Sequence, residues 1–232
     1  MNGVRSAVVA VQRLTQAERA EMWARFSAHY EDVSEPRFLA DLDAKQDVIL
    51  LWRGPRLVGF STLLPLTVVV DGVAHDGVFS GDTVVEAGSR GSGALGVAFL
   101  RYLVGRRLRH PLRPLWWFLL SKGWRTYLLL ANNFPDAHPR PGVEMPVSVR
   151  RLRDAFGARF GEAYDPATGL VRLRAGRVRP DLAGLPSDAP ALATYFVARN
   201  PDAGLGDELV ALAPLPWSLL PRYAWKKLMG RR

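Results

Sequence analysis

The sequence predicts a mixed α/β (α+β) fold, in which helices flank a central, mostly antiparallel sheet. A capped helix signature near the start of the chain is followed by β-branched segments that turn residues separate. In the stretch 81–96, a β-branched strand then passes through a Gly/Ser turn into an amphipathic helix. An apolar fraction of 48% is enough to fill the core of such a fold.

Two helices are expected before the first strand of the predicted sheet. Thr15 and Glu18 form a capping box, and aromatic residues recur at helical spacing after it, so we expect a helix over 16–30. A Ser-Glu-Pro segment then starts a second, short helix over 34–44.

Strands follow these helices. The apolar segments 47–53 and 56–66 are separated by a Gly-Pro turn. Asp71-Gly72 is typical of the turn of a β-hairpin, which joins antiparallel strands. A further strand over 79–85 leads into the Gly/Ser turn, so this part of the sheet is expected to be antiparallel.

The second half of the chain is expected to complete the sheet and to carry an insertion. A helix over 93–109 ends before Pro111, and the apolar run 115–120 is typical of a strand buried on both faces. A helix over 123–133 follows. The remaining expected elements are a basic helix over 148–160, a strand over 169–174 and a closing strand pair formed by 192–197 and 208–212.

We therefore divide the chain into a core with the ligand loop (1–133), an insertion (134–190), the closing strand pair (191–215) and a basic, aromatic tail (216–232).

The Gly/Ser turn predicts a phosphate site. A strand that meets a helix through small residues leaves free N–H groups at the helix start, and the helix dipole favours an anion there. The Walker A pattern is excluded because no Lys follows Gly93. The chain is therefore expected to bind a phosphate-bearing ligand at this turn.

Arg90 and Gly93 occupy the first and second fixed positions of an R-x-x-G-x-G/A loop. With the order of the elements around it, this loop resembles that of the GNAT superfamily of acyl-CoA N-acyltransferases. Leu95 departs from the usual Gly or Ala, and either crowds the pyrophosphate or points into the core. The resemblance implies a GNAT-like fold and transfer of an acyl group from acyl-CoA, the co-substrate, to a small amine acceptor. By this resemblance the acyl-CoA would contact Val84, Val85, Arg90, Gly91, Ser92, Gly93, Ala94 and Leu95.

The resemblance also implies a carboxylate base on the strand before the loop and a tyrosine acid on the helix of 123–133. Asp82 and Glu86 are the candidate bases, and their spacing places them on one face of the strand. Tyr127 is the candidate acid, with a core aromatic as the alternative reading. His75 is another candidate base at neutral pH.

Charge and composition limit the other functions. The sequence lacks Cys, which excludes thiolate sites, and no two of its His residues have metal-ligand spacing, so no metal is expected. The net charge of +9 suits CoA phosphates, an acyl carrier protein, an anionic membrane surface or nucleic acid.

Four alternatives stay open from the sequence. They are a long-chain transferase that uses an acyl carrier protein, a non-catalytic ligand-binding protein of the same fold, peripheral membrane contact through 216–232, and, ranked lowest, nonspecific nucleic-acid binding. Without an evident signal peptide, a cytoplasmic location is expected, with association at a membrane surface as the alternative.

Overall fold

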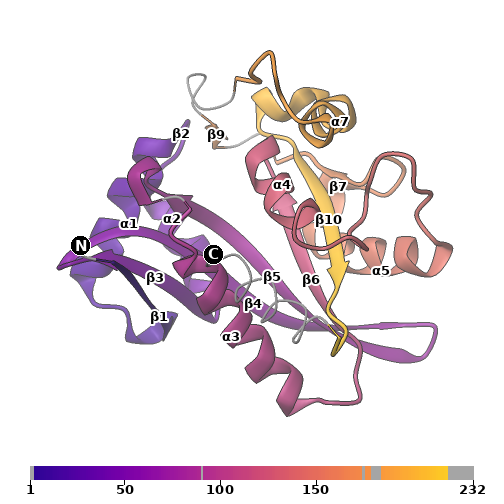
Figure 1. Ribbon diagram of the computed structural model, residues 1–232, viewed down its shortest axis with the longest axis horizontal. Helices are drawn as coiled ribbons and strands as arrows, with labels where there is room; N and C mark the ends of the chain where they lie inside the picture. The colour runs from indigo at the N-terminus through magenta and orange to yellow at the C-terminus, as the bar shows by residue number, and fades with distance from the viewer. Residues whose placement is uncertain (1–2, 90, 174–175, 179–183, 219–232) are drawn as a thin grey trace, which may run out of the picture.

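A computed structural model of the protein describes residues 3–89, 91–173, 176–178 and 184–218. Eight strands form one mixed sheet in the order β1-β3-β4-β5-β6-β10-β8-β7, and helices cover both of its faces (Figure 1). All neighbouring strands are antiparallel except β5 and β6, which run parallel. The predicted fold class, a mostly antiparallel mixed sheet flanked by helices, is confirmed.

The strands of this sheet are β1 (Val4–Ala10), β3 (Asp47–Arg53), β4 (Arg56–Val70), β5 (Val73–Val85), β6 (Leu115–Ser121), β7 (Tyr164–Asp165), β8 (Leu170–Val171) and β10 (Glu208–Pro214). The α-helices are α1 (Gln16–His29), α2 (Glu35–Asp43), α3 (Ala94–Arg109), α4 (Trp124–Ala131), α5 (Val147–Gly157) and α7 (Ala191–Arg199). The 3₁₀ turns are η1 (Val11–Arg13), η2 (Ala87–Ser89), η3 (Ala158–Ala163) and η4 (Pro201–Leu205). In the described part of the chain no helix is both long and apolar enough to span a membrane.

The N-terminal half of the sheet matches the expected elements closely, with one strand missed. The capping box at Thr15 starts α1, and β4 and β5 form one long hairpin with its turn at Asp71 and Gly72. The missed strand is β1, which pairs with β3 along its whole length. Its edge position leaves most of its side chains partly or fully exposed, so it has no clear apolar alternation to reveal it.

The predicted closing strand pair is wrong in its first member. Residues 192–197 belong to helix α7, and only β10 is a strand. Pro190 precedes the first turn of α7, and Ala193 and Phe196 are buried on one face, three residues apart. The apolar sequence of 191–197 fits a short strand or a short helix equally well, so pattern alone does not decide between them.

The two faces of the sheet carry different helices (Figure 1). One apolar cluster joins the sheet to α3, α4 and α7. On the opposite face, one cluster joins it to α1 and α2, and another joins it to α5 of the insertion. We call these the α3 face and the α1 face.

The insertion is built into the α1 face of the sheet. Its helix α5 approaches β5 closely at Gly77, where a Cβ atom would lie 2.7 Å from the ring of Phe156. A short strand, β9 (Arg177–Val178), pairs with β2 (Tyr30–Glu31) at the end of α1. The insertion therefore contacts both the sheet and the N-terminal helices.

Candidate active site

The parallel pair β5 and β6 separates before either strand ends. The two strands pair from Asp76 and Leu115 as far as Ser80 and Leu119. Beyond this point β5 continues to Val85 and pairs only with β4, and the two ribbons diverge in Figure 1. The edge of β5 beyond Ser80 therefore borders two cavities, one on each side of the sheet.

A β-bulge lies where the two strands separate. Gly81 and Asp82 of β5 lie opposite Thr62 alone, because the register with β4 shifts by one residue between Ser80 and Thr83. The extra residue bends the strand, as bulges do. Position 81 has no room for a side chain, since a Cβ atom there would lie 2.6 Å from the Thr62 hydroxyl.

The bulge also decides which face Asp82 occupies. Before the bulge, Val78 packs on the α3 face and Phe79 on the α1 face. In an unbroken strand Asp82 would share the face of Val78. After the shift, Val84 packs with α1 and α2, and Asp82 borders a cavity on that same side.

The larger cavity, of about 1030 Å³, lies on the α3 face. One wall of this cavity is the loop before α3, of which Ser89, Gly91, Ser92 and Gly93 line the cavity. Both glycines have positive φ (77° and 73°), and a Cβ atom on either would meet nothing within 4 Å. Among the described residues, no side chain fills the space beside these two glycines, so the loop is open there toward the cavity.

The start of α3 carries the features that favour an anion. The helix has 16 residues and no acidic residue in its first turn. The Ser89 hydroxyl beside it is buried and has no hydrogen-bond partner in the described part of the chain. The orphan N–H groups of the first turn and the helix dipole add to this site. A diphosphate fits the residues present.

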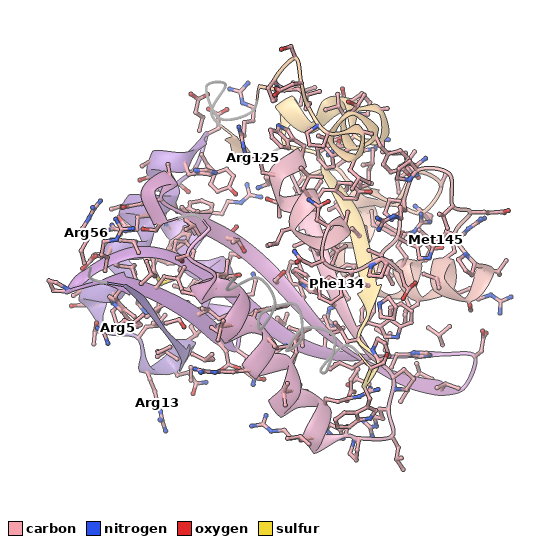
Figure 2. All side chains as sticks on the ribbon, viewed as in Figure 1. Arg5, Arg13, Arg56, Arg125, Phe134 and Met145 are labelled. Atoms are coloured by element: carbon pink, nitrogen blue, oxygen red, sulfur yellow. The ribbon has the colours of Figure 1, made fainter. Side chains whose placement is uncertain are left out.

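The rest of the larger cavity is mostly apolar. Arg125 in the first turn of α4 and Phe134 after the end of α4 border it from the two ends of that helix (Figure 2). Further lining residues are Val85, Leu95, Phe99, Leu103, Leu115, Trp117, Leu119 and Trp217. The cavity thus continues below the loop along the inner side of α3.

The smaller cavity, of about 330 Å³, lies on the α1 face between α2, β5, β6 and the insertion. It shares Tyr30, Thr83, Lys122 and Thr126 with the larger cavity, and we call these residues the junction. Asp82 borders the smaller cavity next to the junction. The other ionisable residues that line it are Asp32, Arg37, Asp41, Lys45, Arg159 and Glu208.

Asp82 has the electrostatic properties of a general base. Burial, and next the charge of Asp41, raise its pKa to about 7, although Lys122 and Lys45 oppose this shift. A carboxyl with a pKa near the working pH can take a proton and release it again. Glu208 is also shifted: its pKa is raised, chiefly by burial, against the opposing charge of Lys122.

Tyr30 has the properties of a hydrogen-bond donor at the junction. Its pKa is raised, first by burial and then by the charges of Asp82 and Glu208, so the phenol keeps its proton. The Lys122 ammonium lies 5.5 Å from the centre of the Tyr30 ring and 3.4 Å from the Glu208 carboxylate. These contacts hold Tyr30 and Lys122 between the two cavities.

The residues expected to contact acyl-CoA are largely brought together. Val85 and Leu95 line the larger cavity with the loop residues named above, and Leu95 also packs against the core. Val84 points to the opposite face, where it is buried against α1 and α2. Ala94 packs on the core without lining the cavity, and Arg90 lies outside the described residues.

The two candidate bases have different environments. Glu86 accepts a hydrogen bond from Arg56 at 2.6 Å, and Arg25 lies 3.6 Å away. It lines neither cavity. The structure therefore brings Asp82, and not Glu86, to the site.

Tyr127 is placed away from both cavities. Its side chain is fully buried, and its hydroxyl donates a hydrogen bond to the Pro139 carbonyl at 2.8 Å. His75, the alternative base, accepts a hydrogen bond from the Trp116 indole and lines neither cavity. A catalytic acid or base must reach the reacting atoms, so this placement removes both residues from the candidate set.

The sequence does not indicate most of the polar and ionisable residues at the junction and in the smaller cavity. Tyr30 ends a helix whose aromatic residues predict only core packing, and Lys45 follows an ordinary amphipathic helix. Glu208 did leave a signal, because it is a carboxylate at the start of an otherwise apolar strand. Among the described residues no group of three or more His, Asp and Glu has the arrangement of a metal site.

A scan against models of protein families and a search of curated proteins gave no match to this sequence. Solved structures give matches of low similarity. A ribosomal-protein-alanine N-acetyltransferase from Brucella melitensis is 16% identical, with a TM-score of 0.43 over 62% of this chain and 98% of that chain. A GNAT family N-acetyltransferase from Escherichia coli, solved in complex with CoA, is 14% identical, with a TM-score of 0.39 over 56% of this chain and 67% of that chain.

A probable N-acyltransferase from Enterococcus faecalis is 16% identical, with a TM-score of 0.41 over 54% of this chain, and the match spans only 31% of its own length. These similarities are too low to carry a function. The order of the elements, the parallel pair that separates and the loop before α3 give the protein the GNAT-like fold that the sequence indicates.

Proposed function

We propose that the protein is an N-acyltransferase that moves an acyl group from an acyl-CoA thioester to a small amine. One observation carries the proposal: two cavities on opposite faces of the sheet meet at the separated edge of β5, beside a carboxyl whose pKa is about 7. A donor and an acceptor that enter from opposite faces would bring their reacting atoms together at the junction, which is the proximity that a two-substrate transfer needs.

The larger cavity suits the acyl-CoA. Its diphosphate would bind the amides of Gly91 and Gly93 and the first turn of α3, and its pantetheine arm would lie along β5 beside Val85. Lys122 and Arg125 border the same cavity, and their positive charge favours an anionic donor there. This arrangement would bring the thioester to the junction.

The smaller cavity suits the amine. Asp82 would take a proton from the ammonium group, and the neutral nitrogen would form its bond to the thioester carbonyl carbon as the carbon–sulfur bond breaks. The second N–H proton passes to the departing sulfur, and the Tyr30 hydroxyl, which borders both cavities, would relay it by giving its own proton to the sulfur and taking the proton from the nitrogen. The products are an amide and free CoA.

A longer acyl chain is the second candidate for the donor. The larger cavity continues below the loop past Phe99, Leu103 and Trp117, whose side chains are apolar. An acyl carrier protein could deliver such a chain in place of CoA.

Thiol release from acyl-CoA in the presence of an amine panel tests the proposed activity. We expect release that depends on an amine, with wild-type CoA binding measured by calorimetry in parallel. A series of acyl-CoA chain lengths and an acyl carrier protein donor separates the two donor candidates. CoA binding without turnover on any amine would indicate a binding protein, and the absence of CoA binding would contradict the proposal altogether.

A further inference from the structure

Three charged side chains that line the smaller cavity form no close ion pair within the described part of the chain. Lys45 pairs with Asp41 at 2.5 Å, and Lys122 pairs with Glu208 at 3.4 Å. Asp32, at the rim, pairs with Arg177. After these pairs are removed, the lining charges that remain are those of Asp82, Arg37 and Arg159, which form no ion pair within 4 Å among the described residues.

These three charges lie at different depths of the cavity. Asp82 is half-buried on β5 beside the junction. Arg37 on α2 and Arg159 on η3 are exposed, and they reach the cavity from the helical layer and from the insertion. The cavity is therefore negative at its inner end, where the acyl group would arrive, and positive at its outer rim.

An apolar wall lies between the two ends. The Phe79 ring is tilted against the Phe118 ring at 5.5 Å and meets the Phe160 ring edge-on at 6.1 Å, measured between ring centres. Leu120 continues this wall toward the junction. At about 330 Å³ the cavity is at the small end of the range for small-molecule sites, roughly 300–1,000 Å³.

We propose that the acceptor is a free amino acid with a large apolar, preferably aromatic, side chain. Its ammonium group would lie against Asp82, its carboxylate would meet the guanidinium groups of Arg37 and Arg159, and its side chain would pack on the phenylalanine wall. Arginine suits this part because its planar donors match a carboxylate. This inference rests on the proposed function and specifies the acceptor class for the same site.

The test compares L-phenylalanine with analogues that each lack one recognised group. Phenethylamine lacks the carboxylate, and glycine lacks the apolar side chain. With the full chain and acetyl-CoA, we expect kcat/KM for phenylalanine to exceed that for either analogue at least tenfold. Equal or faster reaction of phenethylamine would overturn the proposal.

A double substitution tests whether Arg37 and Arg159 cause the preference for phenylalanine over phenethylamine. We expect the double variant Arg37→Ala/Arg159→Ala to raise KM for phenylalanine at least tenfold and to leave the rate with phenethylamine unchanged. Arg151→Ala is the matched control, because Arg151 is an exposed arginine of α5 that pairs with Asp71 and lines neither cavity. An equal loss with both amines in the double variant would contradict recognition of an anion.

Calorimetric titration with phenylalanine separates this inference from the proposed function. Binding that the double variant loses, without any transfer, would support the acceptor site and contradict the transferase. Transfer to other amines, with neither binding nor reaction of phenylalanine, would support the transferase and overturn the acceptor class.

Discussion

The two cavities that meet at the junction are built in different ways. The larger one combines the main chain of the loop before α3 with mostly apolar walls and with polar side chains such as Lys122 and Arg125. The smaller one is lined by ionisable side chains from α2, β5, β10 and the insertion. The first arrangement suits a ligand whose phosphates are common to many donors, whereas the second suits recognition of one particular acceptor.

Of the substitutions that test this difference between the cavities, removal of the base is expected to have the largest effect, which is on kcat. We expect Asp82→Asn to lower kcat by about 10³-fold, because general-base catalysis contributes about 10²–10⁴-fold, while CoA affinity stays near that of wild type. Rapid thiol-release assays and CoA titration measure the two quantities.

Glu86→Gln is the matched control for this variant, since Glu86 is a carboxylate on the same face of the chain that lines neither cavity. Loss of its partly exposed contacts with Arg56 and Arg25 is expected to cost at most about 1 kcal/mol of stability. A Glu86→Gln variant as inactive as Asp82→Asn would move the base away from the smaller cavity.

The two buried tyrosines are expected to respond in opposite ways. Tyr30→Phe removes the hydroxyl at the junction, and we expect kcat to fall by about 10²-fold with little loss of stability. Tyr127→Phe leaves the Pro139 carbonyl without its donor, so we expect a loss of about 1 kcal/mol in the free energy of unfolding and unchanged kcat. Denaturant unfolding and steady-state rates, measured on both variants, would expose a reversed assignment.

A substitution in the loop before α3 is expected to have a smaller effect, which is limited to the affinity for the acyl-CoA. Gly93→Ala adds a side chain at φ 73°, toward open space in the larger cavity, and we expect acyl-CoA to bind about tenfold more weakly, a change of about 1.4 kcal/mol. Acceptor affinity should not change. Gly142→Ala carries the same kind of strain at φ 70° and lines neither cavity, so equal weakening of CoA binding in that variant would exclude the loop as the phosphate site.

The smallest expected effect concerns stability and pH. The pKa of Asp82 is raised to about 7 in the folded protein from 3.8, the ordinary value that applies to the unfolded chain, so the folded state binds the proton more tightly. Between these values the ionised unfolded chain is favoured as pH rises, and Asp82 therefore lowers stability progressively up to about pH 7.

Asp82→Asn removes this penalty. We expect its melting temperature to exceed that of wild type by a few degrees at pH 8 and to come close to it near pH 3.5, where the carboxyl is mostly protonated in both states. Scanning calorimetry at the two pH values measures the difference, and an equal gain at both would mean that ionisation is not its cause.

The comparison of the cavities also explains what the sequence could predict. The loop lining the larger cavity is a contiguous segment, so Gly91 to Gly93 could be recognised from local pattern alone. The smaller cavity combines Tyr30, Lys45 and Glu208 from distant parts of the chain, and no local pattern brings such residues together. Capping and turn signals predict most of the fold. The prediction fails at α7, which is a short apolar run, and at β1, which lies at an edge of the sheet.

Asp82 belongs between these two cases. Its strand and its position close to the loop could be predicted, because the segment 79–85 has a strand pattern and leads directly into the Gly/Ser turn. Its raised pKa could not be predicted, because the charge of Asp41 on α2 and the surrounding burial arise only in the folded chain.

The one extra residue in β5 shows that a small change in a strand is enough to separate two neighbouring strands of a sheet. A chain one residue shorter at Gly81 would keep every later side chain on its present face, because a regular strand would then alternate correctly against β4. It would lose the bend, however, and a straight β5 could pair with β6 to the end of both strands. The composition and the apolar fraction of the chain would hardly differ, yet the two cavities would no longer meet at the junction.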